Sequence, residues 1–274
     1  MKNKPSVDIV IAAYNSHNTI VRTLSSIAIQ KVDFNINVIV VNDGSSYGFK
    51  KEIDLFKDDL NIKEVTLKKN SGPGVAKQKG LDSGKSEYIV FLDSDDVFSD
   101  AFALQSLYKK VTIENSDYTY GALIFEDNGR RNLLKTHDGC LHGKMYKRKI
   151  IEENNIKFNT TRTSEDNSFN HIYLFNSKSI SGVDSVVYVY KDNGKSLTKG
   201  ITISKKADNL IDYINNIIYT MNNVKNKYQD RVIEYYKYCF SYAKNEYEVI
   251  NKISPKDGKR ALVVLNKLEK EKYY

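Results

Sequence analysis

The residues with the clearest chemical potential are 93–96, Asp-Ser-Asp-Asp, which directly follow an apolar run at 88–92. That run has the length of a strand buried on both faces of a parallel sheet. Three carboxylates so close together repel one another unless a cation lies among them. Hard divalent cations such as Mg2+ and Mn2+ take oxygen ligands, and phosphate groups complete their coordination. The stretch therefore predicts a metal–diphosphate site, with a turn that caps a helix near Asp100 as the alternative.

Further polar groups follow other predicted strands. Asp43 comes after a buried apolar run at residues 38–41. Because ligands of open α/β sheets bind at the carboxyl ends of the strands, we expect Asp43 in the same crevice as residues 93–96. The segment 72–74, Gly-Pro-Gly, allows a ligand to approach the backbone closely, although taken alone it favours an ordinary turn. Lys77, one turn into the following helix, can reach the negative charge of a ligand.

The elements that would position these groups form an alternating pattern. Apolar runs at 7–12, 38–41 and 88–92, together with the segment 63–67, Lys-Glu-Val-Thr-Leu, predict four strands. Helices are expected between them at 20–28, 51–59 and 75–81, the first capped by Ser16 or Asn18. Strands that alternate with helices predict an α/β fold with a doubly wound, mostly parallel sheet.

The middle of the chain has a different pattern. Segments 118–125 and 131–135 flank Glu-Asp-Asn-Gly, a strong hairpin signal, which predicts a small antiparallel part. Residues 143–155 look helical, a helix is expected from residue 165, and residues 186–190 predict a strand.

From about residue 203 the pattern is helical throughout, with apolar stripes that predict three helices. Residues 200–274 hold 14 Lys and Arg against 9 Asp and Glu, and the whole chain has a net charge of +8. We therefore expect a catalytic domain at 1–200 and a basic helical extension at 201–274. Such an extension fits an anionic partner (a membrane surface, nucleic acid or an anionic glycan). A biased composition on a solvated face explains the charge equally well.

The sequence also indicates a location. Its 2 cysteines lie far apart and outside any Cys-x-x-Cys pattern, which argues against a disulfide framework and a zinc site. No apolar run approaches the roughly 20 residues that span a bilayer. The N-terminus leads into a predicted strand rather than a signal peptide. These features predict a cytoplasmic protein, with the inner face of the membrane as a further option.

Five motifs, taken in order, closely resemble the family 2 glycosyltransferases of the GT-A fold. They are Ile-Ala-Ala-Tyr-Asn at 11–15, Val-Asn-Asp-Gly-Ser-Ser at 41–46, Asn-Ser-Gly-Pro-Gly-Val-Ala-Lys at 70–77, Phe-Leu-Asp-Ser-Asp-Asp at 91–96, and Glu-Asp at 165–166. Each motif is weak alone, and the ordered set is strong. The resemblance covers about residues 5–200. It implies an inverting glycosyltransferase that uses a nucleotide-diphosphate sugar, with UDP the commonest carrier, and Mn2+ or Mg2+.

The resemblance also implies roles for single residues. Asp166 would be the general base, and Glu165 would orient the acceptor or support Asp166. Asp95 would ligate the metal ion that bridges the diphosphate. Asp93 would contact the ribose, and Asp43 the base. The implied nucleotide-sugar-binding set is Ala13, Tyr14, Asn15, Asp43, Gly72, Pro73, Lys77, Asp93, Ser94 and Asp95.

Three further residues are candidates for binding the acceptor or the diphosphate: His142, Lys144 and Lys191. Lys144 lies in a Gly-Lys-Met-Tyr segment that is similar to the family's Gly-Lys-Leu-Tyr. Lys191, followed by Ser-Leu-Thr at 196–198, resembles the family's closing segment. Lys77 and Lys191 replace family arginines, and a lysine cannot make the bidentate phosphate contact of an arginine.

The function that these features favour is synthesis of a bacterial surface glycan, with a glycan or lipid-linked acceptor. A transferase that acts on modified DNA bases would need the same catalytic half and a basic face. An inactive sugar-nucleotide-binding protein is a third possibility. A nucleotidyltransferase is disfavoured because residues 12–15, Ala-Ala-Tyr-Asn, do not form a Gly-rich phosphate loop.

Overall fold

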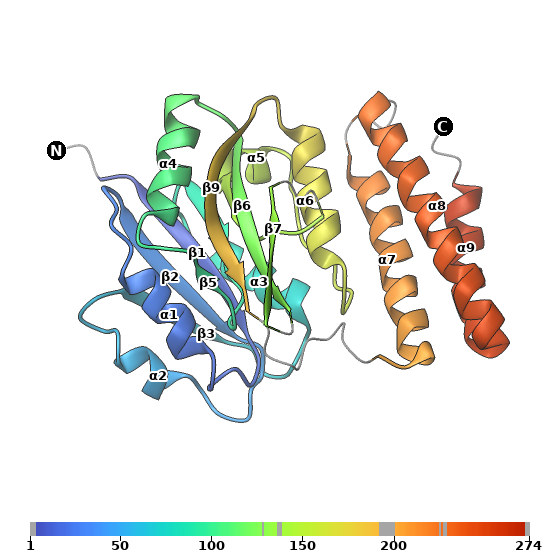
Figure 1. Ribbon diagram of the computed structural model, residues 1–274, viewed down its shortest axis with the longest axis horizontal. Helices are drawn as coiled ribbons and strands as arrows, with labels where there is room; N and C mark the ends of the chain where they lie inside the picture. The colour runs from blue at the N-terminus through green and yellow to red at the C-terminus, as the bar shows by residue number, and fades with distance from the viewer. Residues whose placement is uncertain are drawn as a thin grey trace.

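The computed structural model describes residues 4–127, 129–135, 139–191, 201–224, 226 and 229–271. A twisted sheet with helices packed around it forms the N-terminal part, and three long helices stand beside it at the C-terminal end (Figure 1). The helix that lies between these two parts is α6, Glu165–Asn176.

The sheet begins with four parallel strands in the order β3-β2-β1-β4, which confirms the doubly wound first half. These strands are β1 Ser6–Ala13, β2 Asn35–Asn42, β3 Asn61–Thr66 and β4 Tyr88–Phe91. The sheet continues through β8 Lys144–Lys147, β6 Tyr118–Asp127, β9 Ile180–Tyr190 and β5 Val97–Phe98. The hairpin predicted in the middle is present, with β7 Arg130–Leu134 antiparallel to β6. Asn128, in its turn, lies outside the described residues.

The central strands are apolar because both faces of the sheet are covered. In β1, Val7, Ile9 and Ile11 have no exposed surface. The one charged side chain in that strand, Asp8, is also buried, and it accepts hydrogen bonds from Arg148 Nη2 at 2.7 Å and from the Ser86 backbone N–H at 2.9 Å. A buried carboxylate is tolerated when it is paired and hydrogen-bonded in this way.

The helices of this half are α1 Ile20–Ala28, α2 Lys50–Asp54, α3 Pro73–Ser83, α4 Ala103–Ile113, α5 Arg148–Glu153 and α6. The expected cap of the first helix is wrong: Thr19 occupies that position, and its side chain makes no capping hydrogen bond. The helix expected at 51–59 is also wrong in length, because α2 ends at Asp54.

The helix expected at 143–155 is wrong in its first third. Residues Lys144–Lys147 form β8, which fills the position between β4 and β6, and only then does α5 begin. Met145 and Tyr146 are completely buried there. Tertiary burial in the sheet overrides local helix propensity at this point. The strand expected at 186–190 is the second half of a longer strand, β9, whose pairing with β6 contains an irregularity.

The three predicted C-terminal helices are confirmed as α7 Ile203–Asn223, α8 Asp230–Ile253 and α9 Pro255–Lys270. Their apolar stripes pack together around Ile214, Ile217, Val232, Ala261 and Leu268. The α7 helix also packs against α6, so the extension contacts the catalytic half. Within the part of the chain that the structure describes, none of the helices combines the length and the apolar character needed to cross a membrane.

Candidate active site

The candidate site lies where the parallel strands end. The loops after β1 and β2 are joined, since Ser45 Oγ accepts a hydrogen bond from the Asn15 N–H at 3.0 Å and Asn15 Oδ1 accepts one from the Ser46 N–H at 3.1 Å. Tyr14, in the first of these loops, is 51% exposed. An exposed aromatic side chain at a strand end is available for stacking on a planar ligand.

The Asp43 carboxylate holds the loop that opens α3. Its two oxygens accept hydrogen bonds from the backbone N–H groups of Ser71 at 2.7 Å and Gly72 at 2.9 Å. Gly72 has a φ of +98°, a conformation that favours glycine. A carboxylate has about four acceptor positions, so Asp43 can still accept a bond from a nucleotide base, and that role stays a prediction.

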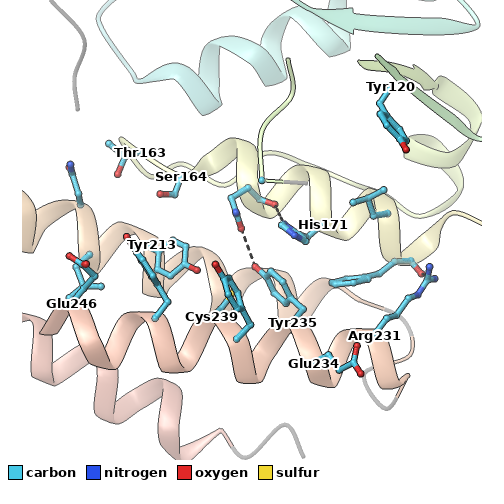
Figure 2. Close-up of a pocket in the computed structure, with 18 of the residues that line it drawn as sticks. Tyr120, Thr163, Ser164, His171, Tyr213, Arg231, Glu234, Tyr235, Cys239 and Glu246 are labelled. Carbon is cyan, nitrogen blue, oxygen red and sulfur yellow. Dashed lines mark hydrogen bonds between the residues drawn. The ribbon is translucent and has the colours of Figure 1, made fainter. Parts of the chain in front are cut away.

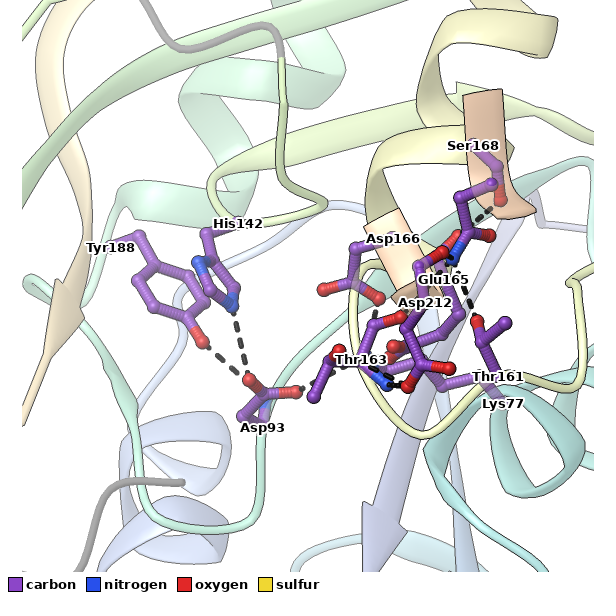
Figure 3. A network of polar contacts seen from close by, with 11 residues as sticks. Lys77, Asp93, His142, Thr161, Thr163, Glu165, Asp166, Ser168, Tyr188 and Asp212 are labelled. Atoms are coloured by element: carbon purple, nitrogen blue, oxygen red, sulfur yellow. Dashed lines mark hydrogen bonds and ion pairs between the residues drawn. The ribbon is translucent and has the colours of Figure 1, made fainter. Parts of the chain in front are cut away.

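Lys77 is the centre of a buried charge cluster (Figure 3). Its side chain is only 6% exposed, and Nζ lies 3.0 Å from Glu165 Oε1, 2.5 Å from Asp166 Oδ1 and 3.9 Å from Asp93 Oδ1. Burial alone would lower the pKa of Lys77, but the charges of these three carboxyl groups raise it well above its usual value. The sequence predicted that Lys77 would face a diphosphate; in this structure it ties the end of β4 to the start of α6.

Glu165 is the most deeply buried carboxyl group of this cluster. Burial raises the pKa of Glu165 to about 8; Lys77 opposes this shift, and the neighbouring charge of Asp166 adds to it. The raised pKa favours the protonated form of Glu165, while Lys77 Nζ contacts both carboxyl groups. The Glu165 side chain is 6% exposed and that of Asp166 is 19% exposed, so the two adjacent carboxyl groups lie in different environments, as in sites where such a pair divides its roles.

The Glu165 pKa predicts a pH dependence of stability. Because the folded-state pKa of about 8 lies above the ordinary value of 4.5, the folded chain binds more protons than the unfolded chain between these values. The free energy of unfolding then falls as the pH rises from about 4.5 to about 8, by at most about 1.4 kcal/mol per pH unit. The Glu165→Gln variant is expected to show a flatter profile in urea unfolding at pH 5, 6, 7 and 8. Parallel profiles for the two proteins would show that Glu165 does not titrate in this range.

A second group of polar contacts surrounds the end of β4. His142 Nε2 lies 3.0 Å from Asp93 Oδ2, and its ring stacks on Tyr188 with centroids 4.8 Å apart. Burial opposes protonation, but the hydrogen bond to Asp93 raises the pKa of His142 well above its usual value. The charges of Lys77 and His142, against the effect of burial, lower the pKa of Asp93. The structure thus joins His142, a predicted acceptor residue, to the predicted donor site.

Asp96 has a structural role, because it joins the turn after β4 to β9 and to the residue that follows it. Its Oδ2 accepts a hydrogen bond from Tyr188 Oη at 2.6 Å, and its Oδ1 accepts one from the Lys191 N–H at 2.8 Å. Burial, together with the charge of Asp93, raises the pKa of Asp96 to about 7. The backbone oxygens of Asp95 and Asp96 are in turn held by α1, through Arg22 Nη2 at 2.5 Å and Thr23 Oγ1 at 2.8 Å.

The donor set near β4 fits a hard divalent cation. Asp93, Asp96 and His142 bring ligand atoms within 4.8 Å of one another. His142 Nε2 is hydrogen-bonded to Asp93, and each oxygen of the Asp96 carboxylate already accepts one hydrogen bond, from Tyr188 or from Lys191. Asp95 is partly exposed, and burial together with the charge of Asp93 raises its pKa. A nearby cation would relieve that repulsion, so the carboxylate oxygens of Asp95 also fit such a cation, and its role as a metal ligand stays a prediction.

Two residues of α7 that the sequence did not single out anchor the loop before Glu165. Asp212 Oδ2 accepts hydrogen bonds from the Arg162 N–H, the Thr163 N–H and Thr163 Oγ1, at 3.1, 3.1 and 3.2 Å. The fully buried Asn216 donates to Thr161 Oγ1 at 2.7 Å and to the Thr163 carbonyl at 3.1 Å. The C-terminal extension therefore positions the loop that leads into Glu165 and Asp166.

Removal of the Asp212 carboxylate should loosen this loop. In an Asp212→Ala variant three donors lose their acceptor, at a cost of about 1–3 kcal/mol each if they stay unsatisfied. We expect a kcat at least tenfold lower, with donor affinity close to that of the wild type, measured by steady-state kinetics and donor titration. Asp208→Ala, one helical turn earlier, removes a carboxylate that pairs with Arg260 rather than with this loop and is the matched control. Equal kcat values for the two variants would contradict a positioning role.

Other predicted residues have structural partners. Lys144 is buried and donates to the carbonyl of Cys140, and Lys191 Nζ pairs with Glu126 Oε2 at 3.0 Å. A Cβ on Gly74 would lie 2.1 Å from the carbonyl oxygen of Asn159, so this glycine permits close packing against the loop before Glu165. Roles of the two lysines in acceptor or diphosphate binding stay predictions. Residues 196–198 lie outside the described part of the chain.

The sheet order, the acidic strand ends and the acidic start of α6 define a GT-A nucleotide-sugar transferase fold. Residues 8–177 match the family model described as "Glycosyl transferase family 2". The chain is 30% identical over 224 residues to poly(ribitol-phosphate) beta-N-acetylglucosaminyltransferase TarP of Staphylococcus aureus, covering 74% of this chain and 68% of TarP. The chain therefore belongs to glycosyl transferase family 2 and is a transferase enzyme.

Solved structures support the same fold. Residues 1–349 of S. aureus TarS, in complex with UDP-GlcNAc, superpose with a TM-score of 0.63 at 18% identity, covering 98% of this chain and 93% of that one. Mannosyltransferase PcManGT of Pyrobaculum calidifontis, in complex with GDP-Man and Mn2+, superposes with a TM-score of 0.61 at 15% identity. This superposition covers 97% of this chain and 75% of that one. The TarS superposition covers the C-terminal helices as well as the sheet.

Proposed function

We propose that this chain transfers a sugar, with inversion, from a UDP-sugar to a hydroxyl group of a bacterial surface glycan. The observation that carries the proposal is the cluster in which Lys77 joins Asp166 and Glu165 to Asp93 at the ends of parallel strands. It brings a candidate base next to the residues that the family resemblance assigns to the donor. The similarity to TarP, whose name describes an N-acetylglucosaminyltransferase, supports transfer of a sugar by this chain and leaves the charge of the acceptor open.

Inverting transfer is a single displacement at the anomeric carbon. Asp166 would accept the proton of the acceptor hydroxyl as its oxygen attacks, while the bond to the diphosphate breaks on the opposite face of the sugar. Lys77 would hold the Asp166 carboxylate in place, and the protonated Glu165 would help to orient it. A Mn2+ or Mg2+ ion, held by Asp95 with Asp93 beside it, would supply charge stabilisation for the departing diphosphate.

The proposed location is the cytoplasm, at or near the inner face of the membrane. Anionic lipids of that surface attract basic segments, and the extension from residue 200 carries 14 Lys and Arg against 9 Asp and Glu. The acceptor would then be presented at the membrane, on a lipid or a growing glycan.

Donor binding tests the proposal directly. We expect UDP-GlcNAc, UDP-glucose or UDP-galactose, measured by thermal shift and calorimetry, to bind more tightly with Mn2+ or Mg2+ than with EDTA. The Asp95→Asn variant should lose this metal dependence, whereas Asp58→Asn, at an exposed position away from the site, should keep it. Binding that is equally tight in EDTA would remove the metal from the proposal, and no binding of any sugar nucleotide would remove the donor site.

A further inference from the structure

A large cavity lies between α6 and the first two C-terminal helices (Figure 2). Its volume is about 1050 Å3. The side chains that line it include six tyrosines from three parts of the chain: Tyr118, Tyr120, Tyr213, Tyr235, Tyr238 and Tyr242. None of the residues assigned above to the donor or the metal lines this cavity, so it is a separate space beside the active site.

One end of the cavity is lined by the chain neighbours of Glu165 and Asp166. Thr163 and Ser164, which directly precede Glu165, line it, and so does Asn167, which directly follows Asp166. Figure 2 shows Thr163 and Ser164 above the same part of the groove as Tyr213 and Glu246, with Arg231 toward the opposite end. Ser164 has a φ of +63°, which sharply turns the chain into α6 at this point. A molecule lying in the groove would thus lead toward the residues that flank the proposed base.

The lining side chains indicate what the groove can hold. Tyr238 is 71% exposed and Tyr242 is 46% exposed, one turn apart on the same face of α8. Tyr235 lies one turn before them and donates its hydroxyl proton to Asn167 Oδ1 at 3.1 Å. Aromatic rings with polar tips, together with amide and hydroxyl groups, offer both a flat apolar surface and hydrogen bonds. Pyranose rings, with one apolar face and a rim of hydroxyl groups, match such a surface.

The charges and the length of the groove limit the classes of ligand that it can bind. Among its described lining residues, Lys206 and Arg231 are basic and Glu234 and Glu246 are acidic. Arg231 is further engaged, since Nη2 donates to the Phe175 carbonyl at 2.7 Å. A polyanion would need an excess of positive charge, which this balanced lining does not supply. From residue 231 to residue 246 α8 extends about 22 Å at 1.5 Å per residue, which is enough for several sugar units.

We infer that this groove binds the acceptor, and that the part of the acceptor it holds is an uncharged chain of several sugar units stacked on the tyrosines of α8. The inference rests on the proposed function, since the end of the chain nearest Ser164 would present its hydroxyl group to Asp166. It assigns the C-terminal extension a substrate-binding role besides its anchoring of the loop before Glu165. The extension would then select for acceptor length.

Binding of oligosaccharides in the absence of donor tests the inference. Cellotetraose, chitotetraose and maltotetraose, with their monosaccharides and a tetramer of ribitol phosphate, are titrated into the full chain by saturation-transfer NMR and calorimetry. We expect at least one neutral tetrasaccharide to bind about tenfold more tightly than its monosaccharide, and more tightly than the ribitol phosphate tetramer. Absence of neutral binding, or preference for the anionic tetramer, would overturn the inference.

A variant of the α8 tyrosines tests whether the tetrasaccharide binds in this groove. The Tyr238→Ala/Tyr242→Ala double variant is expected to bind the tetrasaccharide about tenfold more weakly. Ile253→Ala, which removes a side chain that is 63% exposed on the same helix and outside the groove, should bind like the wild type. Equal affinity of the double variant and the control would contradict the assignment, provided that melting curves show both folded. Donor binding by the wild type, measured separately, tests the proposed function, so the two ideas can fail independently.

Discussion

Replacement of Asp166 by Asn is expected to lower kcat for sugar transfer by about 10²–10⁴-fold. The amide has nearly the shape of the carboxylate, and its oxygen can still accept the hydrogen bond from Lys77 Nζ that Asp166 Oδ1 accepts in the structure. It cannot take a proton from an acceptor hydroxyl group. Because the donor is expected to be held by other residues, its affinity should stay within about twofold of the wild-type value.

Single-turnover transfer and donor calorimetry on the same preparation measure the two quantities. The control is Asp58→Asn, which makes the same chemical change at an exposed position outside the site. If Asp166→Asn retained substantial turnover, another group would have to be the base. If it lost donor affinity to the same extent as kcat, Asp166 would act in donor binding rather than in proton transfer.

Replacement of Lys77 by Met is expected to have the largest effect on stability. The ammonium group lies within 3.0 Å of both Glu165 and Asp166, and its side chain is 6% exposed. When one partner of a buried ion pair is removed, the charge that stays behind is uncompensated, at a typical cost of about 3–5 kcal/mol. The cost should shrink at low pH, because a carboxyl group that has lost its cation partner becomes neutral by binding a proton.

Urea unfolding at pH 5 and pH 8 measures this effect. Lys79→Met, an exposed position on the same helix, is the matched control and should change the free energy of unfolding by less than about 0.5 kcal/mol. A Lys77→Met protein as stable at pH 8 as the control would show that the charge cluster does not hold α3, β4 and α6 together.

The sequence predicted those parts of the fold that depend on local pattern. The apolar runs of β1, β2 and β4 identified the parallel strands because burial on both faces leaves few polar residues in them. Residues 93–96 were placed correctly at a strand end for the same reason. The segment 144–147 was assigned to a helix, since only its position between β4 and β6 makes it a strand.

The candidate site was predictable in its residue types but not in its contacts. The motifs identified Lys77, Asp93, Glu165 and Asp166, yet the pairing of Lys77 with Glu165 joins residues 88 positions apart. The support from Asp212 and Asn216 could not be foreseen, because an Asp and an Asn within a helical stripe carry no signal until the loop they bind is in place. In the sequence, the tyrosines of α8 belong to an ordinary amphipathic pattern. Only the structure shows which of their rings are exposed and line the cavity.

The central proposal is that the Lys77–Glu165–Asp166 cluster catalyses sugar transfer from a nucleotide sugar. Release of UDP from UDP-GlcNAc, UDP-glucose and UDP-galactose in the presence of Mn2+ or Mg2+, with and without an oligosaccharide acceptor, tests it most directly. We expect slow release from one of these donors without acceptor, faster release with it, and loss of both activities in Asp166→Asn. Release of no nucleotide from any sugar nucleotide, with no thermal shift on donor addition, would contradict the proposal and favour an inactive binding protein.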